Sequence, residues 1–286
     1  MKTLFMSFLL AISLFSSVVH ADKPVINWFH ADFPPGFINT GYLKGEGYEN
    51  YLERYLRQAL SEYEHRYYKA NYSRILDEIR TENACCVALL RKPERESFVA
   101  YSQPTMLALS NGVMILRDRY DEFAPFVDQD GYISIKALFR DSDLRMGVSA
   151  GRRYGGGVDE LLSRFGHHPK IVVRSGDDVL RGLLKMIASQ RSIDYAIGYP
   201  HELNWLNYKE KLDGDLQFIP IREMPKFVIS QIGCSKNEWG NKVIARLNDV
   251  LGGEYNDEYK RRYQRFLPAE MIALHEQYIR DVFSSD

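Results

Sequence analysis

Two spacings of apolar residues alternate along the chain, and together they predict an α/β fold. Short apolar runs that stop at polar or proline-containing turns are typical of buried strands. Such runs predict strands at residues 25–29, 66–69, 85–90, 111–117, 145–149, 170–174, 194–199, 216–221 and 227–234. Between them, apolar residues three and four positions apart predict amphipathic helices within residues 48–63, 75–79, 158–165, 179–187, 239–251 and 269–283. Strands and helices that alternate in this way favour parallel strands with helices on the sheet faces.

The alternation of strands and helices starts a second time after a more polar stretch at residues 118–143. This break predicts two α/β lobes, the second inserted into the first, because the C-terminal helices need a sheet to cover. We assign residues 22–117 and 223–286 to the first lobe and residues 118–222 to the second, with two crossover strands between them. A single doubly wound domain is the alternative.

The N-terminus has the order of residues that is typical of a secretory signal peptide. Lys2 precedes a mostly apolar stretch at residues 4–15, and the small residues Val19 and Ala21 stand three and one positions before the expected cut. We expect residues 1–21 to be removed and the rest to be a soluble periplasmic monomer, with a membrane anchor as the alternative. The net charge of −1 comes without a basic stripe, which argues against binding to nucleic acid.

The most specific motif lies at residues 84–104. A buried apolar run ends at a charged, proline-containing turn that holds Arg95, and the aromatic-Ser-x-Pro sequence of residues 101–104 follows. This segment resembles the T-x-x-R…v-d-F-S-x-P-Y segment of periplasmic solute-binding proteins of the family 3 type, the clamshell receptors that deliver amino acids and related solutes to transporters. The resemblance implies a type II periplasmic-binding fold of two lobes, each a mostly parallel sheet flanked by helices. It also implies that Arg95 binds a carboxylate of the ligand.

Open α/β sheets bind ligands beyond the carboxyl ends of their strands, and five loops of this chain are expected there. Matched to the family, these loops provide an aromatic residue that stacks on the ligand, backbone contacts beside the arginine, and a basic, glycine-containing turn in the second lobe. The ligand-binding residues that the resemblance implies are His30, Phe33, Tyr72, Leu90, Arg95, Ser149, Arg152, Arg153 and Tyr199.

Tyr199 departs from the pattern of amino-acid receptors. In the family, an acidic residue near this position pairs with the ligand's α-ammonium group, and a buried ammonium without such a partner is costly. Glu202 or Asp32 could substitute for the missing carboxylate. We therefore predict a small anionic or carboxylate-bearing ligand, captured in the cleft between the lobes for an ABC-type transporter, and no cofactor or metal.

Other interpretations of the same residues stay open. Arg95 sits among charged neighbours that could form an ordinary solvated turn, and the loop at residues 149–153 could be a plain strand-to-helix connection. A binding protein of this kind can also act as the ligand-sensing partner of a membrane receptor. The remaining alternative is an enzyme, because residues 147–151 match the G-x-S-x-G pattern of serine hydrolases. Ser149 would then work with an aspartate and a histidine drawn from Asp177, Asp194, His201 and His275. Three glycines at 155–157 oppose the helix that must follow such a serine, so we expect no enzyme.

Three cysteines remain in the exported chain, which predicts one disulfide and one spare thiol. We expect Cys85 to pair with Cys234; Cys86 with Cys234 is the second choice, and three free thiols are the last. The segment from Cys234 to Gly240 also resembles a C-S-K-x-x-W-G segment in an uncharacterised exported branch of the solute-binding superfamily. That branch has a cysteine on the third strand, which fits Cys85. Ser235 is the expected cap of the helix that follows.

Overall fold

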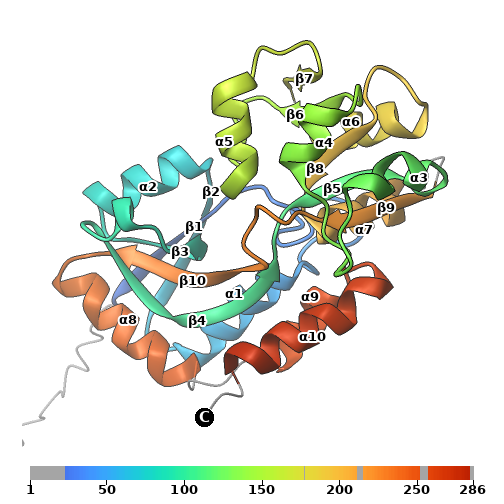
Figure 1. Cartoon of the computed structure of the whole chain (residues 1–286). Helices are drawn as coiled ribbons and strands as arrows, with labels where there is room; N and C mark the ends of the chain where they lie inside the picture. The colour runs from blue at the N-terminus through green and yellow to red at the C-terminus, as the bar shows by residue number, and fades with distance from the viewer. Residues whose placement is uncertain (1–22, 177, 211–214, 252–256, 284–286) are drawn as a thin grey trace, which may run out of the picture.

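The computed structural model describes residues 23–176, 178–210, 215–251 and 257–283, so the predicted signal peptide lies outside the described residues. Two five-stranded sheets form two lobes, seen at the lower left and upper right of Figure 1. The sheet of the first lobe has the order β2 (Glu64–Lys69), β1 (Val25–His30), β3 (Ala84–Leu90), β10 (Phe227–Ser235) and β4 (Val99–Leu109). The sheet of the second lobe has the order β7 (Ile171–Arg174), β6 (Met146–Ser149), β8 (Tyr195–Gly198), β5 (Gly112–Leu116) and β9 (Leu216–Pro220).

Helices cover both faces of the first sheet, as the apolar spacing predicts. One apolar core joins this sheet to α1 (Tyr48–Ala59), α8 (Glu238–Leu251), α9 (Asp257–Gln264) and α10 (Ala269–Phe283). A smaller core on the other face is formed with α2 (Tyr72–Thr81). The carboxyl ends of β1 and β3 therefore lie at one edge of a sheet that is held from both sides.

The second sheet is also enclosed between two cores. One core contains residues of α3 (Tyr120–Phe123), α4 (Ile135–Asp141) and α5 (Gly156–Phe165), and the other contains residues of α6 (Val179–Ala188) and α7 (Pro200–Glu210). Among the described helices, none is both long enough and apolar enough to cross a bilayer.

The strand arrangement corrects two sequence-based expectations. Each sheet is mixed rather than mostly parallel: β1 runs parallel to β2 and β3, but β10 runs antiparallel to both β3 and β4. In the second sheet β6 runs parallel to β7 and β8, and β5 runs antiparallel to β8 and β9. Strand β5 was assigned to the first lobe, yet all its pairing is in the second sheet. Every antiparallel pair includes β5 or β10, the strands that follow the two passages between the lobes. Antiparallel strands need no helical crossover to connect them.

Strand β4 was not predicted at all. Its sequence is interrupted by the polar residues Ser102 and Gln103 and by Pro104, which hide the strand pattern. The pairing of β4 with β10 shifts register beside Pro104, where the missing backbone donor would otherwise break the ladder. This long strand leads directly into β5 and carries the chain from one lobe to the other, as Figure 1 shows.

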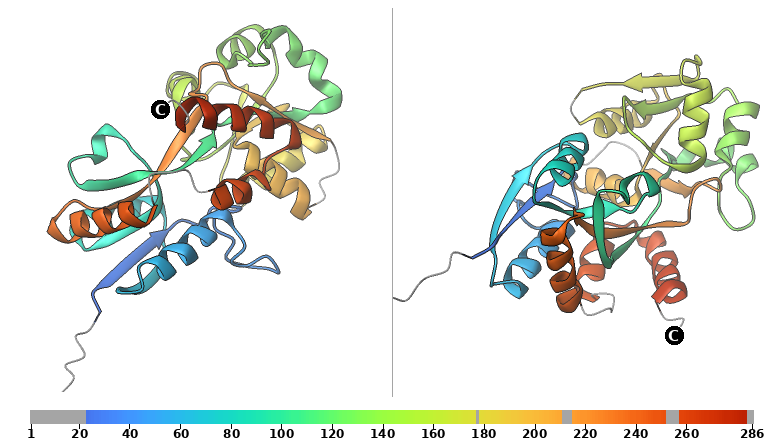
Figure 2. Two further views of the ribbon diagram at one scale, coloured as in Figure 1. Left: turned by 90° about the horizontal axis from the view of Figure 1, so that it is seen from below. Right: turned by 90° about the vertical axis from the view of Figure 1, so that its left-hand side faces the viewer.

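Helices α7 and α10 connect the lobes. The side-chain amide of Asn204 in α7 donates a 3.0 Å hydrogen bond to the carbonyl of Leu267 in the first lobe. The hydroxyl of Tyr278 in α10 is hydrogen-bonded to that of Tyr132 in the second lobe. Figure 2 shows α10, in dark red, extending along the underside of the molecule from one lobe towards the other. The sequence pattern predicted α10 but missed α7, because residues 200–210 have no apolar face.

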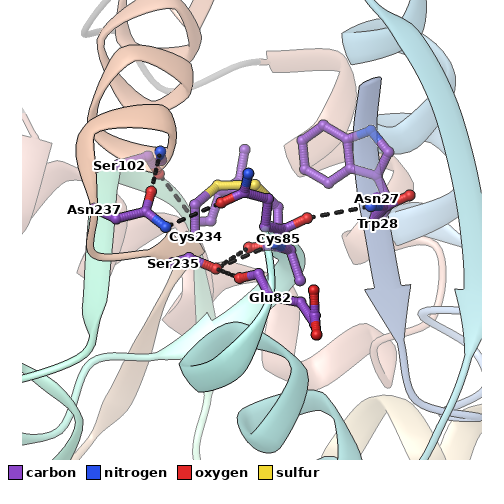
Figure 3. The surroundings of a disulfide bond; sticks show 12 residues. Asn27, Trp28, Glu82, Cys85, Ser102, Cys234, Ser235 and Asn237 are labelled. Carbon is purple, nitrogen blue, oxygen red and sulfur yellow. Dashed lines mark hydrogen bonds between the residues drawn. A yellow bond between two sulfur atoms is a disulfide. The ribbon is translucent and has the colours of Figure 1, made fainter. Parts of the chain in front are cut away.

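The disulfide joins Cys85 of β3 to Cys234 of β10, as predicted, and Cys86 is a buried free thiol. The two bonded residues stand directly opposite each other in the antiparallel pair, while Cys86 belongs to the core on the other face of the sheet. Figure 3 shows that Ser235 does not cap α8: its hydroxyl bonds the Glu82 carbonyl at 2.5 Å and accepts from the Ala84 amide.

Breaking the disulfide should destabilise the first lobe. The link closes a separation of 149 residues, and removing a native disulfide of this kind costs about 2–5 kcal/mol, chiefly by freeing the unfolded chain. We expect dithiothreitol to lower the Tm of the wild type and of Cys86→Ala, and to leave the Tm of the double variant Cys85→Ala/Cys234→Ala unchanged. An equal drop in the double variant would contradict this pairing.

Candidate functional site

A cleft of about 640 Å³ lies between the two lobes at the carboxyl ends of the parallel strands. Eight of the nine residues that the sequence assigns to a ligand site line it, namely Phe33, Tyr72, Leu90, Arg95, Ser149, Arg152, Arg153 and Tyr199. Volumes of this size are typical of sites for small molecules. The structure therefore brings these residues to one place, although their binding roles stay predictions.

His30 does not line the cleft. Its ring is 8% exposed, stacks on Phe37 at 4.3 Å between ring centres, and has Nδ1 at 2.9 Å from a carboxylate oxygen of Glu53. These contacts hold the end of β1 against α1. The resemblance implied His30 as a site residue through the first loop of the family, but its side chain contacts Glu53 and Phe37 within the first lobe.

Arg95 sits in a short 3₁₀ turn at Pro93–Arg95 that follows β3. One guanidinium nitrogen donates a 3.1 Å hydrogen bond to the carbonyl of Leu90, which also lines the cleft. This contact fixes the side chain beside the end of the strand and leaves the rest of its five donors for other partners.

Arg152 forms a buried ion pair with Glu202. Two nearly parallel hydrogen bonds of 2.9 and 2.6 Å join the guanidinium to the two carboxylate oxygens, and the backbone amide of Tyr199 donates to the same carboxylate at 2.9 Å. Burial alone would raise the pKa of Glu202, but the charge and hydrogen bonds of Arg152 hold it below its usual value. Glu202 is thus ionised at neutral pH and already satisfied, so it does not substitute for a free ligand-binding carboxylate.

The other acidic side chains on the cleft wall also have partners. Asp32 is bonded by Lys69 at 2.5 Å, and Asp178 lies 3.3 Å from Arg181. Glu49 is 3% exposed and accepts a 2.6 Å hydrogen bond from the hydroxyl of Tyr259. Burial raises the pKa of Glu49 to about 8, against the effect of that hydrogen bond, so its carboxyl is mostly uncharged at pH 7.

Basic side chains on the wall are in excess. Within the described residues, Lys92, Arg95 and Arg153 line the cleft and make no ion pair. Lys92 and Arg95 come from the first lobe and Arg153 from the second. The cleft consequently carries unneutralised positive charge on both sides, which favours an anion. The sequence analysis did not assign Lys92 or Glu49 to the site, because the sequence alone does not tell which charged residues lie close together in the fold.

His201 lies at the start of α7 and is 1% exposed. Its imidazole stacks on Tyr199 at 5.1 Å and meets Phe33, Tyr48 and Tyr263 edge-on at 5.3–5.9 Å between ring centres. Neither ring nitrogen has a hydrogen-bond partner among the described residues. Burial lowers the pKa of His201 to about 4, so the ring is neutral at pH 7.

The hydrolase constellation is not assembled in the described part of the chain. His201 makes no hydrogen bond to Ser149, and both nitrogens of His275 are engaged, by Gln264 and by the Leu107 carbonyl. Asp194 is paired with Arg119 at 2.7 Å. The fourth candidate, Asp177, lies outside the described residues.

Comparisons with known proteins support the fold. No protein-family model matches the chain, and no curated protein matches it. Solved structures match the chain in fold. An ancestral cationic amino acid solute-binding protein is 15% identical, with a TM-score of 0.59 over 86% of this chain and 96% of that one. The periplasmic VFT2 domain of BvgS from Bordetella pertussis is 15% identical, with a TM-score of 0.57 over 85% and 94%. A structure from a study of glutathione import via GshT and the cystine ABC importer TcyBC of Streptococcus mutans is 14% identical, with a TM-score of 0.56 over 92% and 96%.

These neighbours identify the fold of the chain. The chain has the two-lobed fold of periplasmic solute-binding proteins, as the motif at residues 84–104 predicted. At identities of 12–16% the likeness extends to the fold alone.

The buried carboxyl of Glu49 predicts an unusual pH dependence. Because its folded-state pKa of about 8 lies above the ordinary value of 4.5, this group makes the protein lose stability as pH rises from about 4.5 to about 8. The loss has an upper limit of about 5 kcal/mol, because the pKa shift from 4.5 to about 8 is about 3.5 units at about 1.4 kcal/mol each. Urea unfolding at pH 5 and pH 8 should show a smaller loss for Glu49→Gln than for the wild type. Glu46→Gln, at a side chain 58% exposed, is the matched control; equal losses in all three proteins would contradict the assignment.

Proposed function

We propose that this protein is a periplasmic solute-binding protein that captures a small carboxylate-bearing ligand in the interlobe cleft for an ABC-type transporter. One observation carries the proposal: Lys92, Arg95 and Arg153 line the cleft without a carboxylate partner, while the acidic side chains beside them are paired or uncharged. A guanidinium and a carboxylate match as a fork of two hydrogen bonds, and Arg95 has donors free for such a contact. A ligand that touches both lobes would favour the closed form over the open one.

The same charges argue against a standard amino acid. An α-ammonium group needs an ionised carboxylate, and both candidate substitutes are occupied: Glu202 by Arg152, and Asp32 by Lys69. Releasing Glu202 would leave Arg152 largely buried without its partner, which is costly. The Asp32–Lys69 pair is half exposed and therefore weaker. The cleft therefore suits an anion that has no positive group.

Arg95→Ala should weaken binding of a carboxylate ligand by about tenfold or more, which is the scale of losing hydrogen bonds to a charged group. Isothermal titration with the best carboxylate found in a thermal-shift screen measures the loss. Arg91→Ala is the matched control, since Arg91 is an exposed neighbour that pairs with Glu96 and does not line the cleft. Unchanged affinity in Arg95→Ala, or an equal loss in Arg91→Ala, would remove Arg95 from the site.

The partner of the binding protein is part of the proposal. Structural neighbours include both a solute-binding protein and a periplasmic domain of BvgS, so a sensory role is the second candidate. Deletion of the gene should abolish uptake of the radiolabelled ligand if the protein serves a transporter. Normal uptake with a lost transcriptional response to the ligand would support the sensory role instead.

We also propose that the protein is not a hydrolase. Ser149 lacks a histidine partner among the described residues, so a serine-reactive phosphonate should leave the protein unlabelled, as detected by intact-mass spectrometry. Stoichiometric labelling that disappears in Ser149→Ala would establish the enzyme alternative.

A further inference from the structure

Buried polar atoms without partners are concentrated at the cleft. The described residues contain six such side-chain atoms, and three of them belong to His201 and Ser230, both of which line the cleft. A buried polar atom without a hydrogen bond destabilises a protein, so native structures contain few of them and each one needs an explanation. Here the two residues face the cleft from different lobes, since Ser230 is in β10 and His201 begins α7.

Each of these side chains offers hydrogen bonds to an uncharged group. Neutral imidazole has one N–H donor and one acceptor nitrogen, and a serine hydroxyl can donate and accept. The rings that enclose His201 come from both lobes, Phe33, Tyr48 and Tyr263 from the first and Tyr199 from the second. A ligand can therefore reach the imidazole only if the lobes move apart, which binding at His201 requires.

The charges near His201 leave it suited to a hydroxyl rather than to an ion. The groups that face it are the Arg152–Glu202 pair, whose charges balance, and the tyrosines that pack on its ring. Among the described residues, a ligand ammonium here would meet no ionised carboxylate without a cationic partner, because Glu202 is paired with Arg152 and burial keeps Glu49 mostly protonated. A hydroxyl can match the donor and the acceptor of the ring without any charge.

Resting on the proposed function, we infer that the ligand is a hydroxylated carboxylate of the sugar-acid type, whose carboxylate meets Arg95 and whose hydroxyls bond His201 and Ser230. Aromatic side chains complete the match, because Tyr48, Tyr72 and Trp205 also line the cleft. The apolar C–H faces of a hydroxylated chain pack on such rings, while a few placed polar groups give orientation.

Three six- or five-carbon acids test this inference: D-gluconate, hexanoate and L-glutamate. Gluconate and hexanoate share charge and carbon number but differ in hydroxyls, and glutamate has an ammonium group and a second carboxylate but no hydroxyl. The wild type should bind gluconate at least about tenfold more tightly than either of the others, the scale of two or more hydrogen bonds. His201→Phe and Ser230→Ala should each reduce the gluconate-to-hexanoate ratio by about threefold to tenfold, and Arg95→Ala should weaken both ligands alike.

Ser110→Ala is the matched control, because Ser110 is another buried serine with an unpartnered hydroxyl but lies outside the cleft lining. Its ratio should equal that of the wild type. Ser230→Ala removes an oxygen that bonds nothing in the protein, so it decides the question even if His201→Phe fails to fold. Equal binding of gluconate and hexanoate by the wild type, or an unchanged ratio in Ser230→Ala, would overturn this inference and leave the proposed function standing. Failure of the wild type to bind any carboxylate would instead contradict the proposed function.

Discussion

The buried ion pair between Arg152 and Glu202 sets the chemistry of the cleft. It ties the loop after β6 to the start of α7, and the same carboxylate holds the backbone amide of Tyr199. Removing one partner of such a pair costs about 3–5 kcal/mol, because the other charge stays buried without compensation. The pair therefore fixes the second-lobe wall of the cleft. Because Arg152 and Glu202 bind each other, neither is available to pair with a charged ligand.

The other charged groups of the cleft then determine which ligands it favours. With Glu202 neutralised, the ionised groups without partners on the wall are basic, and they come from both lobes. Glu49 would reduce this positive charge if it were ionised, but burial keeps its carboxyl mostly protonated at pH 7. The wall around His201 is aromatic, and the charges of the adjacent Arg152–Glu202 pair balance each other. The cleft thus combines a cationic rim with a neutral hydrogen-bonding interior, which is a different demand from the paired charges of an amino acid.

Much of this organisation could be predicted from the sequence, and the exceptions have physical reasons. Apolar spacing identified most strands and helices, because burial on a sheet or helix face leaves a periodic record. It missed β4, where Pro104 and its polar neighbours are accommodated by a register shift, and α7, which has no continuous apolar face although Leu203 packs in a core of the second lobe. It also missed the short helices α3, α4 and α9. The motif around Arg95 predicted the fold, but the orientation of His30 and the pairing of Glu202 depend on neighbours distant in the chain.

The contacts between lobes bear on how strongly a ligand can be held. Trp205 of α7 lies edge-on to Phe266 at 5.9 Å, and Phe33 lies edge-on to Tyr199 at 6.0 Å between ring centres. Aromatic side chains of both lobes therefore help to hold the lobes together. A ligand shifts the population of lobe arrangements only by its difference in affinity between them. Every contact that the lobes make with each other in one arrangement lowers the free energy that the ligand must supply to favour that arrangement. Affinity at this cleft therefore depends on α7 and its partners as well as on the residues that touch the ligand.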